Sequence, residues 1–341
     1  MRLAIIIVNW NGRDLLARCL RSIADTAGDL HCDVLVVDNG STDGSQAMLR
    51  ADFPAVRLID SPSNLGFGGG NNLALREVLE ARGLRLEDRE AHPKPHSSDP
   101  KPQASSLKPH DYVVLLNPDT VVQPGALQAL VAFMQGHQHV GVAGARLLNE
   151  DGSFQFSYAR FPGLVDEFLI LTGLGRRRHG PWYPSAGPQQ SVRSHDRAEY
   201  AMGACLIARA DATAEIGPLD EGFFMYSEEI DWCYRFRAAG WSVGYVADAP
   251  IVHLGGGSTR QVRPQMLAEL YRSRVRFFQK HYGLPQALAL RGLLLLMNGT
   301  KLLRARLRGT EAGGTPPLPW PLLRHALSVP PIPRRESRRR A

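Results

Sequence analysis

The sequence predicts an α/β fold with a mostly parallel central sheet and a C-terminal helical extension. Short runs of β-branched and large apolar residues, typical of strands buried on both faces, alternate with stretches of helical spacing. Polar residues follow several of these runs directly, as expected at the carboxyl edge of a parallel sheet, where α/β proteins bind ligands. With 44% hydrophobic residues in 341, the chain can bury a large core.

The alternation is clearest in the first half of the chain, where each apolar run is followed by a helical pattern. The predicted strands are residues 3–8, 33–37, 56–59, 112–116, 140–145, 201–208 and 243–246. The predicted helices are residues 13–24, 43–50, 69–79, 125–134, 264–281 and 286–307, with one more inside 226–241. Residues 154–197 mix aromatic, Gly, Pro and basic residues and predict no particular element.

These patterns divide the chain into three parts. Residues 1–282 are expected to form one α/β domain, interrupted at 85–110 by a disordered surface insertion, because that segment contains five prolines and few apolar residues. A lid over a functional site is the alternative for this insertion. Residues 283–308 predict an amphipathic helical extension. Residues 309–341, rich in Pro and Arg, predict a disordered tail.

The charge of the chain is unevenly distributed. From residue 284 onward there are eleven Arg or Lys and only two Glu, so the tail accounts for the net charge of +7 and the body is slightly acidic. This distribution argues against a nucleic-acid-binding protein. The four cysteines form no C-x-x-C and predict neither a disulfide framework nor a zinc site. The first apolar run is too short for a secretory signal, and we therefore expect a cytoplasmic protein.

Three carboxylates, Glu228, Glu229 and Asp231, are crowded within four residues at the start of a predicted helix. The simplest explanation is that acidic residues are favourable in the first turn of a helix. However, carboxylates this close repel one another and are costly to desolvate together. The more specific hypothesis is therefore that these carboxylates form an acid/base site beside a bound cation.

Two further acidic residues follow predicted buried strands. Asp119 comes directly after the strand at 112–116, in the sequence Asn117-Pro118-Asp119, and Asp38 ends the strand at 33–37. A lone Asn-Pro-Asp more often opens a turn. A carboxylate at such a strand end can also accept hydrogen bonds from a pyrimidine imide or a ribose, and Asn9 and Asn11 on the first strand–helix turn are expected beside Asp38.

A glycine-rich stretch runs from Asn64 to Asn72 and includes Gly66. It brings backbone N–H groups to a helix start, which suits a diphosphate. The stretch is not G-x-G-x-x-G and there is no Walker A motif, which disfavours a dinucleotide-binding site. His253 precedes a second glycine-rich loop, at an expected site edge. Asp119, diphosphate oxygens and one imidazole together would suit Mg²⁺ or Mn²⁺.

Taken in order, these segments resemble glycosyltransferase family 2, the inverting enzymes of GT-A fold, and in particular its rhamnosyltransferase-like branch. The resemblance covers residues 1–282, except for the insertion. The motifs that carry it are IIIVNWNG, VVVDNGSTDGS, NLGFGGGNN, LLNPDT, GPLDEGFFMYSEEIDWCYRFRAAGW and VHLGGGST. The implied GT-A fold is a Rossmann-like nucleotide-diphospho-sugar transferase fold.

The resemblance also implies roles for the residues. Asp38 would contact the nucleotide base, and Asn117 and Asp119 stand where the family has D-x-D, so Asp119 would hold the metal together with His253. Glu229 matches the general base, which is usually Asp in the family, and Glu228 and Asp231 remain alternatives. The residues expected to bind the nucleotide-sugar are Asn9, Asn11, Asp38, Asn64, Gly66, Asn72, Asn117 and Asp119.

The implied function is a metal-dependent transfer of a sugar, such as rhamnose from dTDP-rhamnose, to a glycan or lipid-linked acceptor in cell-envelope polysaccharide synthesis. The alternatives are a sugar-phosphate nucleotidyltransferase, or a non-catalytic nucleotide-binding scaffold docked on a membrane. The leucine-rich basic helix at 286–307 is too short in charge-free length to span a bilayer. It predicts docking on an anionic membrane surface, ordinary packing on the domain or a dimer contact.

Overall fold

A computed structural model describes residues 1–84, 110–255, 263–308 and 317–330. Its centre is a nine-stranded mixed sheet of strand order β3-β2-β1-β4-β10-β6-β11-β5, with β8 pairing β11. The strands are β1 (Arg2–Asn9), β2 (His31–Asp38), β3 (Arg57–Asp60), β4 (Tyr112–Leu116), β5 (Thr120–Val122), β6 (Val140–Leu148), β8 (His195–Ala198), β10 (Cys205–Arg209) and β11 (Ser242–His253). β7 (Tyr158–Ala159) and β9 (Tyr200–Ala201) form a separate pair.

The pairing confirms a mostly parallel α/β sheet. β1 pairs in parallel with β2 and β4, and β2 with β3, while β6 pairs in parallel with β11. β10 lies antiparallel between β4 and β6. The antiparallel direction of β10 was not indicated by its sequence, because a short apolar run reads the same in both directions.

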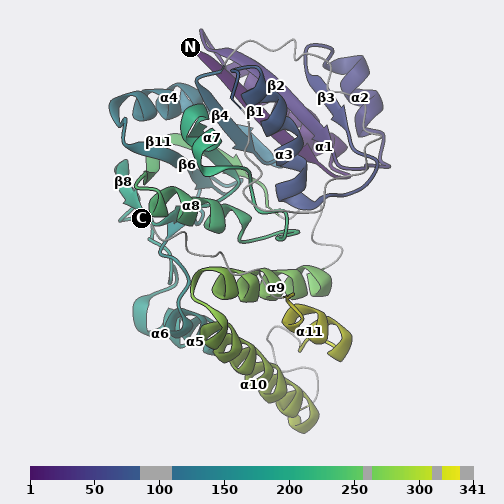
Figure 1. The fold of residues 1–341 in the computed structure, drawn as a ribbon, viewed down its shortest axis with the longest axis vertical. Coiled ribbons are helices and arrows are strands. Elements are labelled where there is room, and N and C mark those ends of the chain that lie inside the picture. Colours follow the sequence, from purple (N-terminus) through teal and green to yellow (C-terminus); the bar gives the residue numbers. More distant parts are fainter. Residues whose placement is uncertain (85–109, 256–262, 309–316, 331–341) are drawn as a thin grey trace, which may run out of the picture.

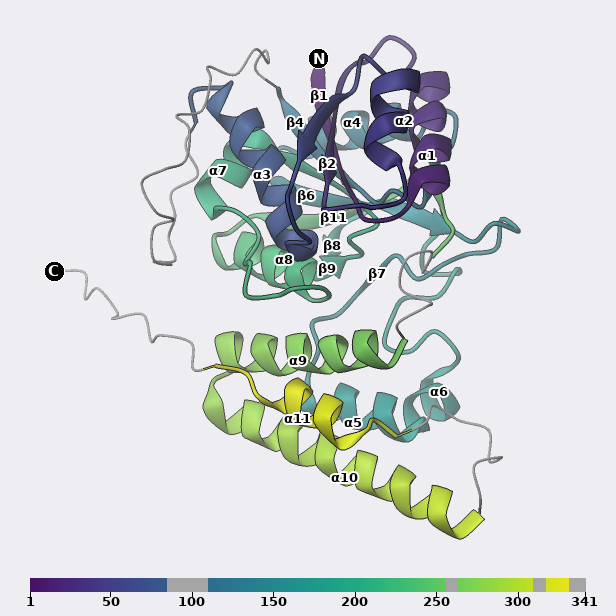
Figure 2. The same ribbon diagram turned by 90° about the vertical axis from the view of Figure 1, so that its right-hand side faces the viewer.

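Helices cover both faces of the sheet, which explains why the strand sequences do not alternate (Figure 2). In β1, Ile5 and Ile7 pack toward α1 and α4, whereas Ala4 and Ile6 pack toward α3 and α8. The helices of these two layers are α1 (Arg13–Thr26), α2 (Ser45–Asp52), α3 (Gly66–Glu80), α4 (Ala126–Gly136), α7 (Ala210–Ile216) and α8 (Glu228–Ala238).

A second group of helices, here called the helical module, lies below the sheet in both views (Figures 1 and 2). It consists of α5 (Leu164–Thr172), α6 (Leu174–His179), α9 (Arg263–His281), α10 (Leu284–Arg308) and α11 (Trp320–Leu327). α9 is nearest the sheet and α10 is furthest from it. The segment at 154–197, which predicted no element, therefore supplies two of the five helices.

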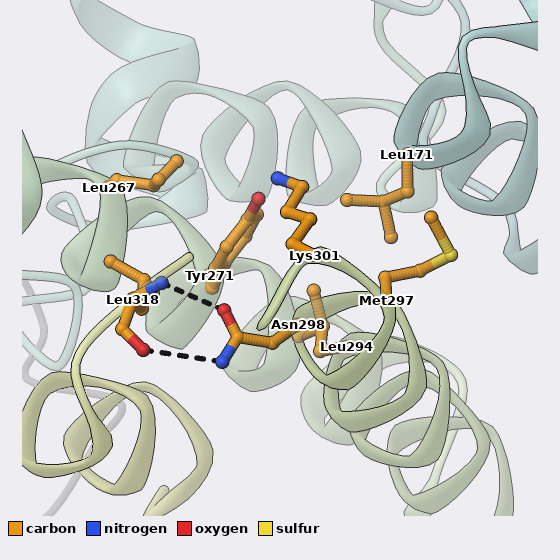
Figure 3. Close-up of a pocket in the computed structure, with 8 residues that line it drawn as sticks. All are labelled: Leu171, Leu267, Tyr271, Leu294, Met297, Asn298, Lys301 and Leu318. Carbon is orange, nitrogen blue, oxygen red and sulfur yellow. Dashed lines mark hydrogen bonds between the residues drawn. The ribbon is translucent and has the colours of Figure 1, made fainter. Parts of the chain in front are cut away.

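The prediction of disorder at 309–341 is wrong for residues 317–330. α11 packs on α9, where Leu318, Leu323 and Ala326 bury a small core against Ala268. Asn298 of α10 fixes the segment before α11 through hydrogen bonds to the backbone N and O of Leu318, at 2.8 and 3.2 Å (Figure 3). Apolar side chains spaced along the Pro-rich segment thus bury enough surface to order it.

Most of the predicted insertion at 85–110, and the rest of the tail, lie outside the described residues. The exception is His110, which is buried, with its Nε2 2.7 Å from Oδ2 of Asp33.

α10 has two apolar stripes with different surroundings. Ala287, Leu290 and Leu294 are buried in the module, as expected for packing on the domain. Leu288 and Leu296, on the other stripe, are 52% and 64% exposed. Within the described ranges we find no helix that combines the length and the hydrophobicity needed to cross a bilayer.

Candidate active site at the carboxyl edge of the sheet

Asp38 and Asn9 form the first part of the site, at the ends of two paired parallel strands. Their register places Asn9 opposite Asp38. Oδ2 of the buried Asp38 accepts a hydrogen bond from Nδ2 of Asn9 at 3.2 Å, and Oδ1 accepts from Nε2 of Gln46 at 2.7 Å and from the backbone N of Ser41 at 2.9 Å. Oδ1 of Asn9 is buried and has no partner among the described residues. An unused acceptor therefore lies beside a fixed carboxylate.

Asn11 joins the two turns that surround this carboxylate. Its backbone has a φ of +50°, its N donates to Oγ of Ser41 at 2.9 Å, and its Oδ1 accepts from the backbone N of Thr42 at 2.8 Å. The Asn11 side chain thus holds the β1–α1 turn against the β2–α2 turn.

Asn64, Gly66 and Asn72 fix the start of α3. Oδ1 of Asn64 accepts from the backbone N of Gly66 at 2.9 Å. Gly66 has a φ of +74°, and a Cβ there would lie 2.1 Å from the carbonyl oxygen of Phe224. Asn72 exchanges two hydrogen bonds with the backbone of Leu219, at 2.9 and 3.0 Å. These groups hold α3 against the segment that precedes the carboxylate helix α8.

Asp119 and His253 approach each other across the β5–β11 pair, in which His253 is opposite Thr120. Nε2 of His253 lies 3.4 Å from Oδ1 of Asp119, and Nδ2 of Asn117 lies 3.5 Å from the same Nε2. The backbone N of Leu254 donates to the carbonyl of Asp119 at 2.9 Å, which fixes the two chains side by side. The two predicted metal ligands are therefore brought together.

Gln155 orients the His253 ring, a role that no motif or spacing in the sequence indicates. Its Nε2 donates to the carbonyl of His253 at 3.1 Å and to Oδ1 of Asn149 at 2.9 Å, so its Oε1 is the acceptor. This oxygen lies 2.7 Å from Nδ1 of His253. A hydrogen bond between these two atoms requires a proton on Nδ1, and in the neutral ring Nε2 then carries the lone pair that faces Asp119. Acceptors of this kind commonly orient metal-binding histidines.

The donor set fits a hard divalent cation that also binds a diphosphate. One carboxylate oxygen and one unprotonated imidazole nitrogen converge, and within the described ranges no group of three His, Cys, Asp or Glu side chains is arranged to hold a metal. The protein would therefore supply two ligands, leaving the others to phosphate oxygens and water.

The carboxylate helix α8 begins in a strained backbone. Tyr226 and Ser227 have φ values of +69° and +66°, and Glu228 and Glu229 follow in the first turn, both buried. Burial raises the pKa of Glu229, while the positive charge of Arg274 favours the ionised form. Burial and the neighbouring Glu229 raise the pKa of Glu228 further, and its Oε2 has no partner among the described residues.

Asp231 has a different environment. Its carboxylate is fully buried and lies 2.8 Å from Nε of Arg235, 2.9 Å from Nζ of Lys280 and 2.7 Å from Nε2 of His281. Burial alone would raise the pKa of Asp231, but these three neighbours outweigh it and hold the pKa well below its usual range. A carboxylate with both oxygens occupied by cations is a weak base, so Asp231 ties α8 to α9.

Glu229 and the Asp119 segment meet where β10 begins beside the end of β4. A Cβ on Gly203 would lie 3.4 Å from Cβ of Glu229. The next residue, Ala204, accepts a hydrogen bond from the backbone N of Asn117 at 2.9 Å. The backbone of Gly203 and Ala204 thus lies between Glu229 and Asn117, which is two residues before Asp119.

This sheet, with its carboxylates at the carboxyl edge, defines a glycosyltransferase of GT-A fold. A solved structure of GalNAc-T7 with UDP, GalNAc and Mn²⁺ has a similar fold, with a TM-score of 0.52 at 14% identity over 82% of this chain. The chain spans 48% of that structure's length. The family model of glycosyltransferase-like family 2 matches residues 1–278, and the chain belongs to this family.

Two curated relatives are rhamnosyltransferases. The N-acetylglucosaminyl-diphospho-decaprenol L-rhamnosyltransferase of Mycobacterium tuberculosis is 28% identical over 300 residues, covering 86% of this chain and 91% of the relative. The rhamnosyltransferase WbbL of Escherichia coli is 25% identical over 252 residues, covering 73% of this chain and 82% of the relative.

We expect Asp231→Asn to lower the free energy of unfolding by about 3–5 kcal/mol, because it leaves buried cations without their counter-charge. Urea denaturation should show this loss at neutral pH. Because the folded pKa of Asp231 is depressed, the difference from wild type should persist down to about pH 4, the unfolded pKa, and shrink below it. The control is Asp14→Asn, which breaks a pair whose carboxylate is 86% exposed. Equal small losses in both variants would contradict the structural role.

We expect Gln155→Leu to weaken Mn²⁺ binding by roughly 10–100-fold, because the His253 ring loses the acceptor that fixes its tautomer. Calorimetric titration of Mn²⁺ in the presence of a nucleoside diphosphate measures the affinity. Nitrogen NMR of His253 should also show a loss of the Nδ1–H tautomer. Gln135→Leu, on the exposed side of α4, is the control. Unchanged affinity and tautomer would remove Gln155 from this role.

Proposed function

We propose that the protein is a metal-dependent inverting glycosyltransferase that moves rhamnose from dTDP-rhamnose to a hydroxyl of a lipid-linked glycan in cell-envelope polysaccharide synthesis. The observation that carries the proposal is the position of Glu229, a buried carboxylate of raised pKa, beside the backbone that also contacts Asn117, two residues before Asp119 of the Asp119–His253 pair. The choice of rhamnose rests on the names of the two relatives, and the choice of a lipid-linked acceptor on the name of the Mycobacterium tuberculosis relative alone.

For the donor, we propose that its nucleotide lies over the ends of β1 and β2. The unused Oδ1 of Asn9 can accept the imide N–H of a pyrimidine base, which a thymine ring supplies, and the fixed Asp38 lies next to it. The diphosphate would then extend along the sheet edge toward Asp119. Asn64, Gly66 and Asn72 would support this site by shaping the start of α3, and Asn11 by holding the two turns together.

For the base, we propose Glu229. Its carboxylate takes the proton from the acceptor hydroxyl while that oxygen attacks the anomeric carbon, and the bond to the diphosphate oxygen breaks on the opposite face. Glu228 lacks a cation to favour its ionised form, and Asp231 has its oxygens occupied, so Glu229 is the best placed of the three.

For the leaving group, we propose that Asp119 and His253 hold a divalent cation, with Gln155 fixing the His253 ring. The bound cation would neutralise charge on the departing diphosphate. Asn117, whose amide lies within reach of the same imidazole, would help to position the donor.

For the acceptor, we propose a lipid-linked glycan presented at the inner face of the cell membrane. The module carries exposed apolar side chains on α5 and α10, which could face such a membrane.

Substitution of the base tests the mechanism. We expect Glu229→Gln to lower kcat for transfer by on the order of 10²–10⁴ and to leave donor binding largely unchanged, because Gln keeps the size but cannot accept the proton. Glu228→Gln should have a much smaller effect, since Gln resembles the protonated Glu228. In wild type the acid limb of the pH–rate profile should lie above the range of an ordinary Glu. A larger loss in Glu228→Gln than in Glu229→Gln would reassign the base.

Removal of the metal tests the leaving-group proposal. We expect EDTA to abolish transfer and donor hydrolysis, and Mn²⁺ or Mg²⁺ to restore both. Asp119→Ala should raise the Mn²⁺ concentration needed for half-maximal activity, because one of two protein ligands is lost. The matched control is Asp43→Ala. Asp43 is a carboxylate of the β2–α2 turn that accepts a hydrogen bond from the Ser45 hydroxyl and is not one of the proposed metal ligands. Full activity in metal-free buffer would contradict the proposal.

A further inference from the structure

Helix α5 exposes part of its apolar surface and buries a charge. Glu167 is 6% exposed and its Oε1 lies 3.0 Å from Nε of Arg274 on α9. Leu164 and Leu171 pack against the core, whereas Val165 and Phe168 are 72% and 44% exposed. A helix packed only for stability would cover more of the valine and the phenylalanine. The outer side of α5 is therefore suited to contact with another apolar medium.

Helix α10 has the same property along its length. Its buried stripe packs toward α9, while the other stripe exposes leucines at spacings of four and seven residues. The most exposed are Leu307, Leu296 and Leu303, at 75%, 64% and 57%. A row of this length is not the scatter of single apolar residues that ordinary surfaces carry.

The two exposed faces belong to one surface of the module. α5 buries Glu167 against α9 and α10 buries its packing stripe toward the same helix, so the apolar residues of both point away from α9. α5 and α10 are in contact, and both views place them beyond α9 as seen from the sheet (Figures 1 and 2). Segments more than a hundred residues apart in sequence thus build one apolar face.

The charges around this face are basic. Arg176, Arg177 and Arg178 follow α5 directly and are exposed. α10 contains no acidic residue. The two acidic residues of α5 are both engaged, Glu167 by Arg274 and Asp166 by Arg160 at 3.2 Å.

We propose that α5, α6 and α10 together form a surface that docks the protein on an anionic lipid bilayer. Apolar side chains would enter the boundary between headgroups and acyl chains, and the arginines would meet anionic headgroups. A second copy of the chain is a poorer occupant, because a two-fold contact would bring the same arginine cluster against itself. The role of this surface in presenting a lipid-linked acceptor rests on the proposed function.

The shared helix α9 gives docking a defined geometry. Arg274 of α9 pairs with Glu167 of α5, and its positive charge also favours the ionised form of the candidate base Glu229. The bilayer would therefore sit at a fixed distance below the sheet edge. This geometry suits a lipid-linked glycan acceptor, because the glycan holds the reacting hydroxyl at some distance from the membrane surface.

Vesicle co-sedimentation of the full chain tests the proposal. Wild type should pellet with vesicles of equal parts phosphatidylglycerol and phosphatidylcholine, and far less with phosphatidylcholine alone. The variant Val165→Ser/Phe168→Ser/Leu296→Ser should bind at least tenfold more weakly, as should Arg176→Gln/Arg177→Gln/Arg178→Gln. Val192→Ser is the control, since Val192 is 63% exposed but lies outside the module. Circular dichroism confirms that each variant is folded.

The outcomes separate this proposal from the proposed function. Equal pelleting of wild type and both triple variants would overturn the docking surface, as would a dimer of wild type in solution that the serine variant abolishes. Mn²⁺-dependent donor hydrolysis, measured without vesicles, tests the transferase alone. Loss of hydrolysis in wild type would remove the proposed function and leave the pelleting result intact.

Discussion

The buried charge of Asp231 is the interaction on which the arrangement of the site depends. A lone carboxylate at this depth would be strongly unfavourable, and two cations, Arg235 and Lys280, together with the imidazole of His281 offset the cost. Lys280 also lies 2.8 Å from Asp220, in the segment just before α8. One ionic cluster thus joins α8, the chain that leads into it, and helix α9 of the module. The strained turn at Tyr226 and Ser227 is held in place by these contacts, and with it the direction of Glu229.

Much of the fold follows from the sequence because parallel strands with helices on both faces leave a simple pattern. The run from Leu3 to Val8 has no alternation, and the structure shows why: Ile6 and Ile7 enter different cores. The pairing of Asp119 with His253 was also predictable, since each follows a strand that ends at the same edge. The direction of β10, the helices at 164–179 and α11 were not, because they depend on which surfaces meet in three dimensions.

The carboxylate cluster shows that the spacing of residues in the sequence does not reveal which of several carboxylates acts as a base. The sequence places Glu228, Glu229 and Asp231 in one turn and cannot separate them. The α9 groups that distinguish Glu229 and Asp231 lie about 45 to 50 residues further along the chain, whereas Glu228 has no such neighbour among the causes of its raised pKa. Gln155 shows a different limit. A glutamine in a polar, irregular stretch belongs to no recognisable motif, and its role in the site becomes visible only through its contact with the His253 ring.

Strand β10 runs against β4 and β6, so its first residues arrive at the edge where the parallel strands end. The chain therefore builds the two sides of the site in two separate passes. Residues up to 122 form the side proposed for the nucleotide, and residues from 202 onward bring in the glutamates, His253 and three of the five helices of the module. A substitution in the later segment can therefore alter the side that holds the glutamates while the contacts of Asp38 and Asn9 stay as they are.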